Sequence, residues 1–442
     1  MGPKKWKLTS AQVIILSFIV MIMTGTLLLL LPFAKRGPGG ATFMEALFTA
    51  TSASCVTGLI VQDTATYWSG FGQAVILLLI QIGGLGVVTM ALAISLVSGK
   101  RIGLRERSTM QEAISAPKVG GIVKLTGFIL RMTAAFELGG MVLLLPVFIR
   151  DFGFPKGVWY AMFHSISAFC NAGFDLMGAR EKYSSLTSYA GNPLVVLVVS
   201  ALVIIGGIGF MVWEDVRTNR LRFKRYRMQT KVVLVTSALL LTIPTILFFL
   251  LEYREGSVGS RLLMAWFQSM TARTAGFNTA DLTLMSQAGM AVMIVLMLVG
   301  GSPGSTAGGM KTTTLAVLLS NMRSVFRRRE DTQFFGRRIE KETVRNAATI
   351  ATMYVVLFVT GGCLISRIEG IPLLTCLYET ASAVGTVGVT LGITPSLGTV
   401  SRLIIVVLMY MGRVGGLTLI YATVSSQQSS LSKYPVEKIT VG

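Results

Sequence analysis

The chain has 442 residues, of which 52% are hydrophobic and only 14% are charged, and its mean hydropathy is +0.68. Soluble domains carry about 25% charged residues, so this composition excludes a soluble enzyme, a disordered scaffold and a secreted disulfide module. The net charge of +20 arises from 40 Lys and Arg against 20 Asp and Glu. These basic residues lie in short segments between apolar runs, which indicates membrane topology and not binding to nucleic acid.

Eight apolar stretches are long enough to be predicted as membrane spans. They lie near residues 11–31, 71–98, 122–148, 193–213, 231–251, 286–319, 344–366 and 400–424. The first is not followed by a small-residue cleavage site, so we expect it to remain as a helix and not to be removed as a signal peptide. Shorter segments rich in Ser, Thr, Ala and Gly lie near 44–58, 159–173, 262–276 and 374–388. About fifteen residues cannot cross a bilayer as a helix, so we predict that these segments are re-entrant.

Basic residues fall unequally on the two sides of this predicted topology. One side collects 26 of the 40 Lys and Arg, in the N-terminus, in 99–124, 217–231 and 321–345, and in the C-terminal tail; the other side holds ten. The positive-inside rule then places both termini in the cytoplasm and the re-entrant segments outside. The expected location is the cell membrane, with multiple passes. The basic loops can also bind the headgroups of membrane lipid.

A short pattern recurs four times in the re-entrant segments. It reads FTATSASCVTGL from Phe48, FHSISAFCNAGF from Phe163, WFQSMTARTAGF from Trp266 and YETASAVGTVGV from Tyr378. Each copy has an aromatic residue ten positions before a glycine, and one predicted span lies before the copy and one after it. A lone glycine is common in membrane helices and turns, but four in matched context indicate a repeat. The glycines are Gly58, Gly173, Gly276 and Gly388, spaced by 115, 103 and 112 residues.

We therefore predict an all-α polytopic membrane protein with eight transmembrane helices. Four repeats of span, pore helix, glycine loop and span would surround one pore in a pseudo-fourfold arrangement. The expected repeats are residues 1–98, 99–216, 217–320 and 321–442, all within one transmembrane pore domain. Glycine tolerates positive φ, so neighbouring carbonyl groups can point to the same side of a loop. Rings of carbonyl groups replace the hydration shell of a permeating cation, and the scarcity of charged side chains in these loops favours a monovalent cation.

The glycine loops VTGL, NAGF, TAGF and TVGV, the fourfold repeat and the eight spans resemble the Trk/Ktr/HKT superfamily of potassium transporters, over nearly the whole chain. The chain is most similar to the Ktr B-type membrane subunit. That resemblance implies one pore per chain, a homodimer, and a ring of cytosolic nucleotide-binding regulatory subunits of the Ktr A or Trk A kind. The chain has no Walker motif or dinucleotide fingerprint of its own, so nucleotide control is expected to come from another polypeptide.

The resemblance also assigns a selectivity filter that binds potassium. All four key positions are glycine, the pattern that the family associates with potassium, whereas members with serine in the first loop tend towards sodium. The expected filter residues are Val56, Thr57, Gly58, Asn171, Ala172, Gly173, Thr274, Ala275, Gly276, Thr386, Val387 and Gly388.

Several polar residues near the glycine loops have alternative interpretations. Asp63, Asp175 and Asn278 follow three of the loops and either concentrate cations at the outer mouth or simply cap and solvate a loop. Arg273 precedes Gly276 by three residues, where a cation would repel a permeating ion, so we expect it to point away and pair with an acidic or carbonyl group. We interpret His164, inside the second pore helix, as a packed, hydrogen-bonded residue and not as a ligand or pH sensor.

The predicted second span of each repeat contains a glycine cluster: GGLG at 83–86, GGIG at 206–209, GGSPG at 300–304 and GRVGG at 412–416. Small residues permit close helix packing, which is our interpretation of three of them. The third continues as GGSPGSTAGGMKTTT, and Gly and Pro are the poorest helix formers. We predict a mobile loop below the filter, which the family resemblance identifies as the gate; the alternative is a purely structural helix break. The expected gate residues are Gly300, Gly301, Gly304, Ser305, Thr306, Gly308, Gly309, Lys311 and Arg413.

Arg413 lies within an apolar stretch, 25 residues after Gly388. An arginine at membrane depth needs a partner and indicates function, although a side chain that snorkels to the interface is the alternative. We predict that Arg413 faces the pore, hydrogen-bonds the 300–314 loop as a latch and forms a barrier to cations. Lys311 is expected to add to that barrier.

Three functions follow from these patterns. The first is a potassium-selective, channel-like subunit of a potassium uptake system. The second is a sodium-coupled or sodium-conducting carrier, but a carrier of alternating access predicts inverted repeats, and here each repeat contains two spans and begins on the same side. The third is a scaffold or enzyme without permeation; no catalytic or metal constellation supports it, and the four cysteines lack metal-type spacing. We expect no enzyme activity and no bound cofactor, with potassium as the transported ion and sodium as a candidate activator.

Overall fold

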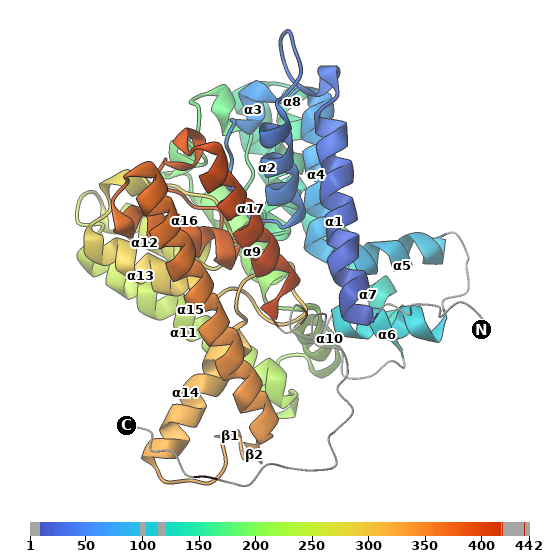
Figure 1. Cartoon of the computed structure of the whole chain (residues 1–442), viewed down its shortest axis with the longest axis vertical. Coiled ribbons are helices and arrows are strands. Elements are labelled where there is room, and N and C mark those ends of the chain that lie inside the picture. Colours follow the sequence, from blue (N-terminus) through green and yellow to red (C-terminus); the bar gives the residue numbers. More distant parts are fainter. Residues whose placement is uncertain (1–8, 98–102, 114–120, 417, 419–436, 438–442) are drawn as a thin grey trace.

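The computed structural model describes residues 9–97, 103–113, 121–416, 418 and 437, and these residues are almost entirely helical (Figure 1). The expected cytoplasmic positions of the two termini, including Lys4, Lys5, Lys7 and the C-terminal tail, lie outside the described residues.

The helices of the first half are α1 (Ser10–Leu29), α2 (Phe43–Ser54), α3 (Thr64–Tyr67), α4 (Gly70–Leu85), α5 (Val87–Val97), α6 (Leu104–Ala113), α7 (Ile122–Phe152), α8 (Lys156–Phe169), α9 (Pro193–Gly207) and α10 (Phe210–Asn219). Those of the second half are α11 (Met228–Leu251), α12 (Val258–Thr271), α13 (Gln287–Leu298), α14 (Thr312–Phe326), α15 (Lys341–Glu369), α16 (Leu373–Gly385) and α17 (Thr399–Val414). Short 3-10 helices are η1 (Pro32–Ala34), η2 (Met177–Ala179), η3 (Thr187–Tyr189), η4 (Phe223–Arg225), η5 (Leu282–Leu284) and η6 (Thr394–Ser396), and an antiparallel hairpin pairs β1 (Gln333–Phe334) with β2 (Arg337–Arg338).

Four of the described helices are long and apolar enough to cross a membrane: α1, α7, α11 and α15. A fifth candidate is the pair α9 and α10, which meet at an angle of 95°, while α4 and α13 are shorter apolar helices. These lengths and compositions indicate a polytopic membrane protein.

Local sequence fixes where several helices begin. Thr9 and Gln12 form a capping box at the start of α1, and Thr42 and Glu45 form another at the start of α2. Each box satisfies backbone N–H groups that have no partner within the helix.

The helices that follow the glycine loops are broken at their glycine clusters, which corrects our expectation of continuous spans over 71–98, 193–213 and 400–424. Gly86 (φ 89°) separates α4 from α5, Gly209 (φ 103°) precedes α10, and Gly415 (φ 86°) ends α17. Glycine adopts a positive φ at little cost, and a residue with positive φ interrupts an α-helix. The remainder of the last predicted span, beyond Gly416 and apart from residue 418, lies outside the described residues.

The same clusters also provide the close packing that we predicted. A Cβ on Gly83 would clash with the carbonyl oxygen of Ser54, on Gly206 with that of Phe169, and on Gly412 with that of Val384. Each of these carbonyl groups lies at the end of a short helix that leads into a glycine loop. In each of these clusters, the first glycine allows the short helix to pack closely against the longer helix. A glycine three residues later has positive φ and lies where the longer helix ends.

Contacts between helices form a closed cycle. The short helices α8, α12, α16 and α2 pack against α4, α9, α13 and α17, respectively, so each apolar helix contacts the short helix of the next repeated segment. The last contact, between α17 and α2, joins the two ends of the chain. Figure 1 shows α17 beside α2. Helices α5 and α6 extend sideways near the lower end of α1 in this view.

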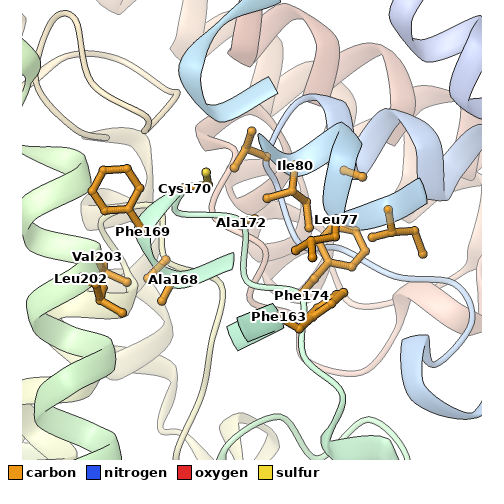
Figure 2. Close-up of a cluster of buried hydrophobic side chains, with 14 of the residues drawn as sticks. Leu77, Ile80, Phe163, Ala168, Phe169, Cys170, Ala172, Phe174, Leu202 and Val203 are labelled. Carbon is orange, nitrogen blue, oxygen red and sulfur yellow. The ribbon is translucent and has the colours of Figure 1, made fainter. Parts of the chain in front are cut away.

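Buried apolar side chains hold the glycine loops between these helices. Around the second loop, Leu77 and Ile80 of α4 lie near Phe163 and Phe174, while Leu202 of α9 lies on the other side (Figure 2). Phe163 is fully buried, as expected for the aromatic residue that recurs in all four copies. Inside a membrane such a ring contributes mainly van der Waals packing, because lipid tails are as apolar as the protein core. The packed side chains support the loop from both sides.

Candidate functional site

The four glycine loops (56–58, 171–173, 274–276 and 386–388) share one backbone conformation. The first residue of each has positive φ, between 51° and 62°, and so does the glycine, between 69° and 95°, whereas the middle residue does not. Left-handed backbone is uncommon outside glycine and marks functional positions. An alternation of left-handed and ordinary φ turns successive carbonyl groups towards one side of the loop.

Hydrogen bonds tie each loop to the helix before it. The middle residues Thr57, Ala172 and Val387 donate through their N–H groups to the carbonyl oxygens of Ser52, Ser167 and Ser382, each at 2.8 Å. The third loop differs, because Ala275 donates to Thr271, four residues earlier instead of five. The loops are therefore quasi-equivalent.

The four glycines meet in a ring. A Cβ added to Gly58 would lie 2.5 Å from the carbonyl oxygen of Ala172, and one on Gly173 would lie 2.5 Å from the Cα of Gly276. A Cβ on Gly276 would lie 2.8 Å from the carbonyl oxygen of Val387, and one on Gly388 would lie 3.0 Å from the Cα of Gly58. Each loop thus touches the next, in chain order, and the fourth returns to the first.

Polar atoms in this ring lack protein partners. Among the described residues, the hydroxyl groups of Thr57, Thr274 and Thr386 and the amide nitrogen of Asn171 are buried without a hydrogen bond. Burying an unpaired hydroxyl costs roughly 1–3 kcal/mol. Unpaired hydroxyl oxygens beside aligned carbonyl groups form a suitable environment for a dehydrated monovalent cation.

Two cavities lie near the glycine ring. The first is next to the ring, and the second lies beyond the loop between α13 and α14. A cavity of about 350 Å³ is lined by all four ring glycines and by Asp175, Asn278 and Asp281. A second cavity, of about 230 Å³, is lined by Gly84, Lys311 and Arg413 and by the loop between α13 and α14. A path between the two cavities would pass through the ring and then past this loop.

Two of the residues predicted for the outer mouth, Asp175 and Asn278, line the cavity next to the ring. Both also make local hydrogen bonds: Asp175 Oδ1 accepts from the N–H of Met177 (2.8 Å), and Asn278 Nδ2 donates to the carbonyl oxygen of Ala280 (3.1 Å). Burial, with a smaller contribution from the nearby Asp63 charge, raises the pKa of Asp175 to about 7. Asp63 instead caps α3 by accepting from Thr66, and also accepts from the backbone N–H of Tyr183. Asp281 also lines the cavity, a position that our sequence analysis missed.

The gate loop predicted over 300–314 is observed over residues 299–311 and folds back beneath the ring. Residues 312–314 are instead the first turn of α14, which corrects the predicted end of the loop. Its base is closed by a hydrogen bond from the N–H of Gly300 to the carbonyl oxygen of Met310 (2.8 Å). Thr306 donates through its hydroxyl to Asn171 Oδ1 (2.8 Å), in the second glycine loop. A Cβ on Gly309 would lie 2.8 Å from the carbonyl oxygen of Gly385, just before the fourth loop. The loop therefore lies directly against two of the four glycine loops.

The same loop packs onto the break between α9 and α10. Ser302 donates through its N–H to the carbonyl oxygen of Gly207 (2.9 Å), and the N–H of Phe210 donates to the carbonyl oxygen of Gly304 (2.7 Å). Gly301 and Gly308 also allow close contacts, with Ala307 and Thr386, respectively.

Two cations hold the loop. Arg413 donates to the carbonyl oxygens of Thr306, Gly83 and Gly84, the last at 3.1 Å. Lys311 Nζ donates to the carbonyl oxygens of Ala307 (2.8 Å) and Gly308 (3.3 Å). Arg413 is therefore hydrogen-bonded both to α4 and to the loop, which is the contact on which the latch hypothesis depends.

Two other sequence interpretations can be compared with the structure. Arg273 is buried and points to the hydroxyl of Ser237 (3.3 Å), so its partner is neither the acidic nor the carbonyl group that we expected. Among the described residues Arg273 forms no ion pair, and Ser237 of α11 supplies the hydroxyl oxygen that accepts its hydrogen bond. His164 is fully buried, contacts the carbonyl oxygen of Tyr160 (2.7 Å) and accepts from the N–H of Leu176 (3.3 Å). It is packed and hydrogen-bonded, as predicted.

Two carboxylates that support the loops were not assigned to this role from the sequence: Glu379 is fully buried and Glu137 is half-buried. Glu379 of α16 accepts from the hydroxyls of Thr390 (2.8 Å) and Thr394, which follow the fourth loop. Glu137 of α7 accepts from Gln81 of α4 (3.0 Å), beside Cys170. The position of Glu137 inside an apolar helix indicates a functional or paired carboxylate. Its partner Gln81, however, lies 56 positions away in the chain and cannot be inferred from the sequence.

Comparison with known proteins shows the family to which this chain belongs. The sequence model of the TrkH family, described as a cation transport protein, matches residues 8–434. The chain belongs to the TrkH family. Its relatives include the potassium/sodium uptake protein NtpJ of Enterococcus hirae, which is 39% identical over 99% of this chain and 98% of that protein. The Ktr system potassium uptake protein B of Bacillus subtilis is 38% identical over 99% of this chain and 98% of its own length.

A solved structure of this family has the same fold. The potassium transporter TrkH from Vibrio parahaemolyticus superposes with a TM-score of 0.74, covering 96% of this chain and 86% of its own, although only 18% of residues are identical. The resemblance inferred from the glycine loops is thus confirmed at the level of the TrkH family.

Proposed function

We propose that this chain is the potassium-selective, ion-translocating subunit of a potassium uptake system, with channel-like conduction through the glycine ring. One observation carries the proposal: four loops of matched backbone meet in a closed ring, with one cavity beside it and another beyond the adjoining loop. The unpaired hydroxyl groups at the ring and the names of the relatives, which are potassium uptake proteins, support it.

The proposed architecture is four repeats of span, pore helix, glycine loop and span, with the boundaries predicted from the sequence. In this assignment α2, α8, α12 and α16 are the pore helices. The cyclic packing of these helices against α17, α4, α9 and α13 supports a pseudo-fourfold pore. We further propose that the 350 Å³ cavity faces the outside and the 230 Å³ cavity the cytoplasm. Phe210 of α10 and Thr314 of α14 line the second cavity, and these helices lead into the basic segments 217–231 and 321–345.

The loop 299–311 is the proposed gate. It touches the second and fourth glycine loops, and Arg413 joins it to α4 by charged hydrogen bonds. Many backbone hydrogen bonds of this loop are made with other segments and not within a helix. The loop can therefore move without unfolding a helix. The positive charges of Lys311 and Arg413 would oppose a cation until that displacement.

We also propose a homodimer that assembles with a cytosolic nucleotide-binding regulatory subunit. The support is the resemblance to Ktr B-type subunits and the relatives' names, which describe parts of a Ktr system. The exposed basic segments after α10 and α14 offer a surface for such a partner.

The direct test measures uptake of potassium, rubidium and sodium into proteoliposomes containing this chain, with Gly276→Ser compared with wild type. A side chain at Gly276 would lie 2.7 Å from the Cα of Gly173, so the ring must distort. We expect selectivity for potassium over sodium to fall at least about tenfold, equivalent to about 1.4 kcal/mol. Gly39→Ser is the matched control: Gly39 has a similar φ of 81°, but nothing lies within 4 Å of its added Cβ.

Sodium transport is the alternative, favoured by the name of the Enterococcus relative, a potassium/sodium uptake protein. It predicts saturable sodium uptake in the wild-type chain that Gly276→Ser leaves unchanged. Sodium that only accelerates potassium uptake would instead indicate an activator.

A further inference from the structure

A groove on the membrane-facing surface has no role in the proposed ion path. It lies between α11, α13 and α14 and encloses about 580 Å³. Its walls are almost wholly apolar, and Leu239, Ile243, Val295 and Leu319 each expose half or more of their surface there. In a chain that spans a membrane, such a groove faces hydrocarbon.

Two of the three helices around the groove, α11 and α14, carry a basic residue at one end of it. On α11, Leu247, Ile243, Leu239 and Val235 follow one another at four-residue spacing and lead to Lys231. On α14, Leu315 and Leu319 lead at the same spacing to Arg323. Residues four apart share one helix face, so each apolar row has its basic residue at the same end of the groove.

Neither of these two cations is paired with a carboxylate in the part of the chain that the structure describes. Lys231 Nζ donates to the carbonyl oxygen of Lys224 (2.9 Å) and lies over the rings of Phe223 and Phe335, at 5.8 and 5.9 Å from their centroids. The rings hold the ammonium group in place and leave its charge available to an anion.

The length of the apolar row fits one leaflet. From Val235 to Leu247 the helix rises about 18 Å, which is close to the roughly 15 Å of hydrocarbon in one leaflet. We propose that the α11–α14 groove binds an acyl chain of an anionic phospholipid, whose headgroup contacts Lys231 and Arg323. A second copy of the chain is disfavoured as the occupant, because it would bring its own basic residues to this rim.

This lipid would contact the helix that carries the loop 299–311. The N–H of Thr312, the first residue of α14, donates to the carbonyl oxygen of Gly301 (3.0 Å), and its hydroxyl pairs with that of Ser302 (3.1 Å). Leu315, one turn later, lines the groove. Lipid occupancy would therefore stabilise the position of α14 and, if the loop is the gate, would alter ion flux; this last step rests on the proposed function.

The chain contains a comparison groove. It lies between α1 and α4, encloses about 560 Å³ and is equally apolar, but α1 and α4 carry no Lys or Arg among their described residues. We expect it to accept acyl chains without a preference for headgroup charge.

The test uses the full chain in nanodiscs of equal parts phosphatidylcholine and phosphatidylglycerol, followed by native mass spectrometry of the lipids retained after release. We expect wild type to retain phosphatidylglycerol preferentially, and the Lys231→Gln/Arg323→Gln double variant to lose about thirtyfold of that preference. Each surface cation contributes roughly fivefold in affinity for anionic lipid. Lys124→Gln, an exposed basic residue of α7 away from the groove, should keep the preference.

Ala291→Trp tests the apolar part of the site. Ala291 is exposed and lines the groove, so an indole there would fill it while both cations remain. Loss of retained phosphatidylglycerol would support the proposal. Unchanged retention in the double variant, or an equal loss with Lys124→Gln, would overturn it. The proposal would also be overturned if Ala291→Trp changed the dimer content, measured by light scattering, while lipid retention stayed the same. Retention is measured without ion flux, so these outcomes do not depend on the proposed transport function.

Discussion

Arg413 of α17 donates a hydrogen bond from its guanidinium group to the backbone carbonyl oxygen of Thr306, 107 residues earlier in the chain. The same guanidinium donates to Gly83 and Gly84 at the end of α4, and Thr306 itself donates to Asn171 Oδ1. One side chain thus connects three segments beneath the ring: α17, α4 and the loop 299–311.

Removal of this connection should release the loop. We expect Arg413→Ala to raise potassium and rubidium uptake about tenfold or more, because a charged hydrogen bond contributes roughly 1.5–3 kcal/mol and a positive charge leaves the path. The measurement is the initial rate of rubidium uptake into proteoliposomes at matched protein density.

Arg413→Lys separates the two contributions. Lysine keeps the charge but lacks the planar fork that reaches carbonyl groups on two segments, so its uptake rate should fall between those of wild type and Arg413→Ala. A rate for Arg413→Ala at or below that of wild type, with the protein folded, would contradict the latch.

The glycines of the first cluster should be required for stability. A Cβ on Gly84 would lie 2.7 Å from Cys170 Sγ, at the end of α8. Overpacking of this kind costs about 1–3 kcal/mol, so Gly84→Ala should lower the unfolding temperature in detergent, measured by circular dichroism. Gly127→Ala, in α7 with nothing within 4 Å, should be neutral or stabilising by up to about 1 kcal/mol. Equal effects of the two would show that helix propensity, and not packing, decides.

Much of the architecture could be predicted because it depends on local pattern. The length of an apolar run, the recurrence of Phe48 and its counterparts, and the spacing of four glycines are visible in one dimension. The left-handed φ at Gly58 and at the other three ring glycines follows from the residue type. The first residues of the loops also have positive φ, yet Val56 and Thr386 are poor candidates for it. Nothing local in the sequence indicates that conformation, which occurs where each loop contacts its neighbours in the ring.

Partners distant in the chain could not be predicted. Nothing near Arg273 in the sequence indicates Ser237, and nothing near Asp63 indicates the N–H of Tyr183, 120 residues later. The breaks at Gly86, Gly209 and Gly415 were also missed. Glycine within an apolar run is compatible both with close packing and with a break, and tertiary contacts decide between them.

The outer cavity should attract cations through Asp175. This carboxylate lines the 350 Å³ cavity together with the ring glycines. At about pH 8, where a carboxyl group with a pKa of about 7 is mostly ionised, we expect Asp175→Asn to raise the KM for potassium about two- to fivefold with an unchanged maximal rate, since it removes a nearby charge but leaves the ring intact. The effect should be lost as the pH falls through about 7 and the wild-type carboxylate is protonated. The difference should shrink as choline chloride is added, because salt screens charges in open cavities. Glu255→Gln, an exposed residue that does not line the cavity, is the control. A change confined to the maximal rate would exclude Asp175 as a concentrating charge.

Glu379 should hold the fourth glycine loop in place. Its side chain is fully buried in α16 and accepts from the hydroxyls of Thr390 and Thr394, on the segment that leaves the ring. Glu379→Ala would leave both hydroxyls without this partner and open a cavity, so we expect a loss of about 2–4 kcal/mol in stability and a weaker preference for potassium over sodium.

Glu379→Gln keeps the shape of the side chain and one acceptor oxygen, and hydroxyl groups can reorient to donate or accept. It should therefore lose only about 1 kcal/mol and keep most of the selectivity. The checks are the unfolding temperature in detergent and the ratio of rubidium to sodium uptake in proteoliposomes. If Glu379→Ala lowered stability but left the uptake ratio unchanged, the carboxylate would support the fold without positioning the loop, because a loosened fourth loop must change the spacing of the ring carbonyl groups.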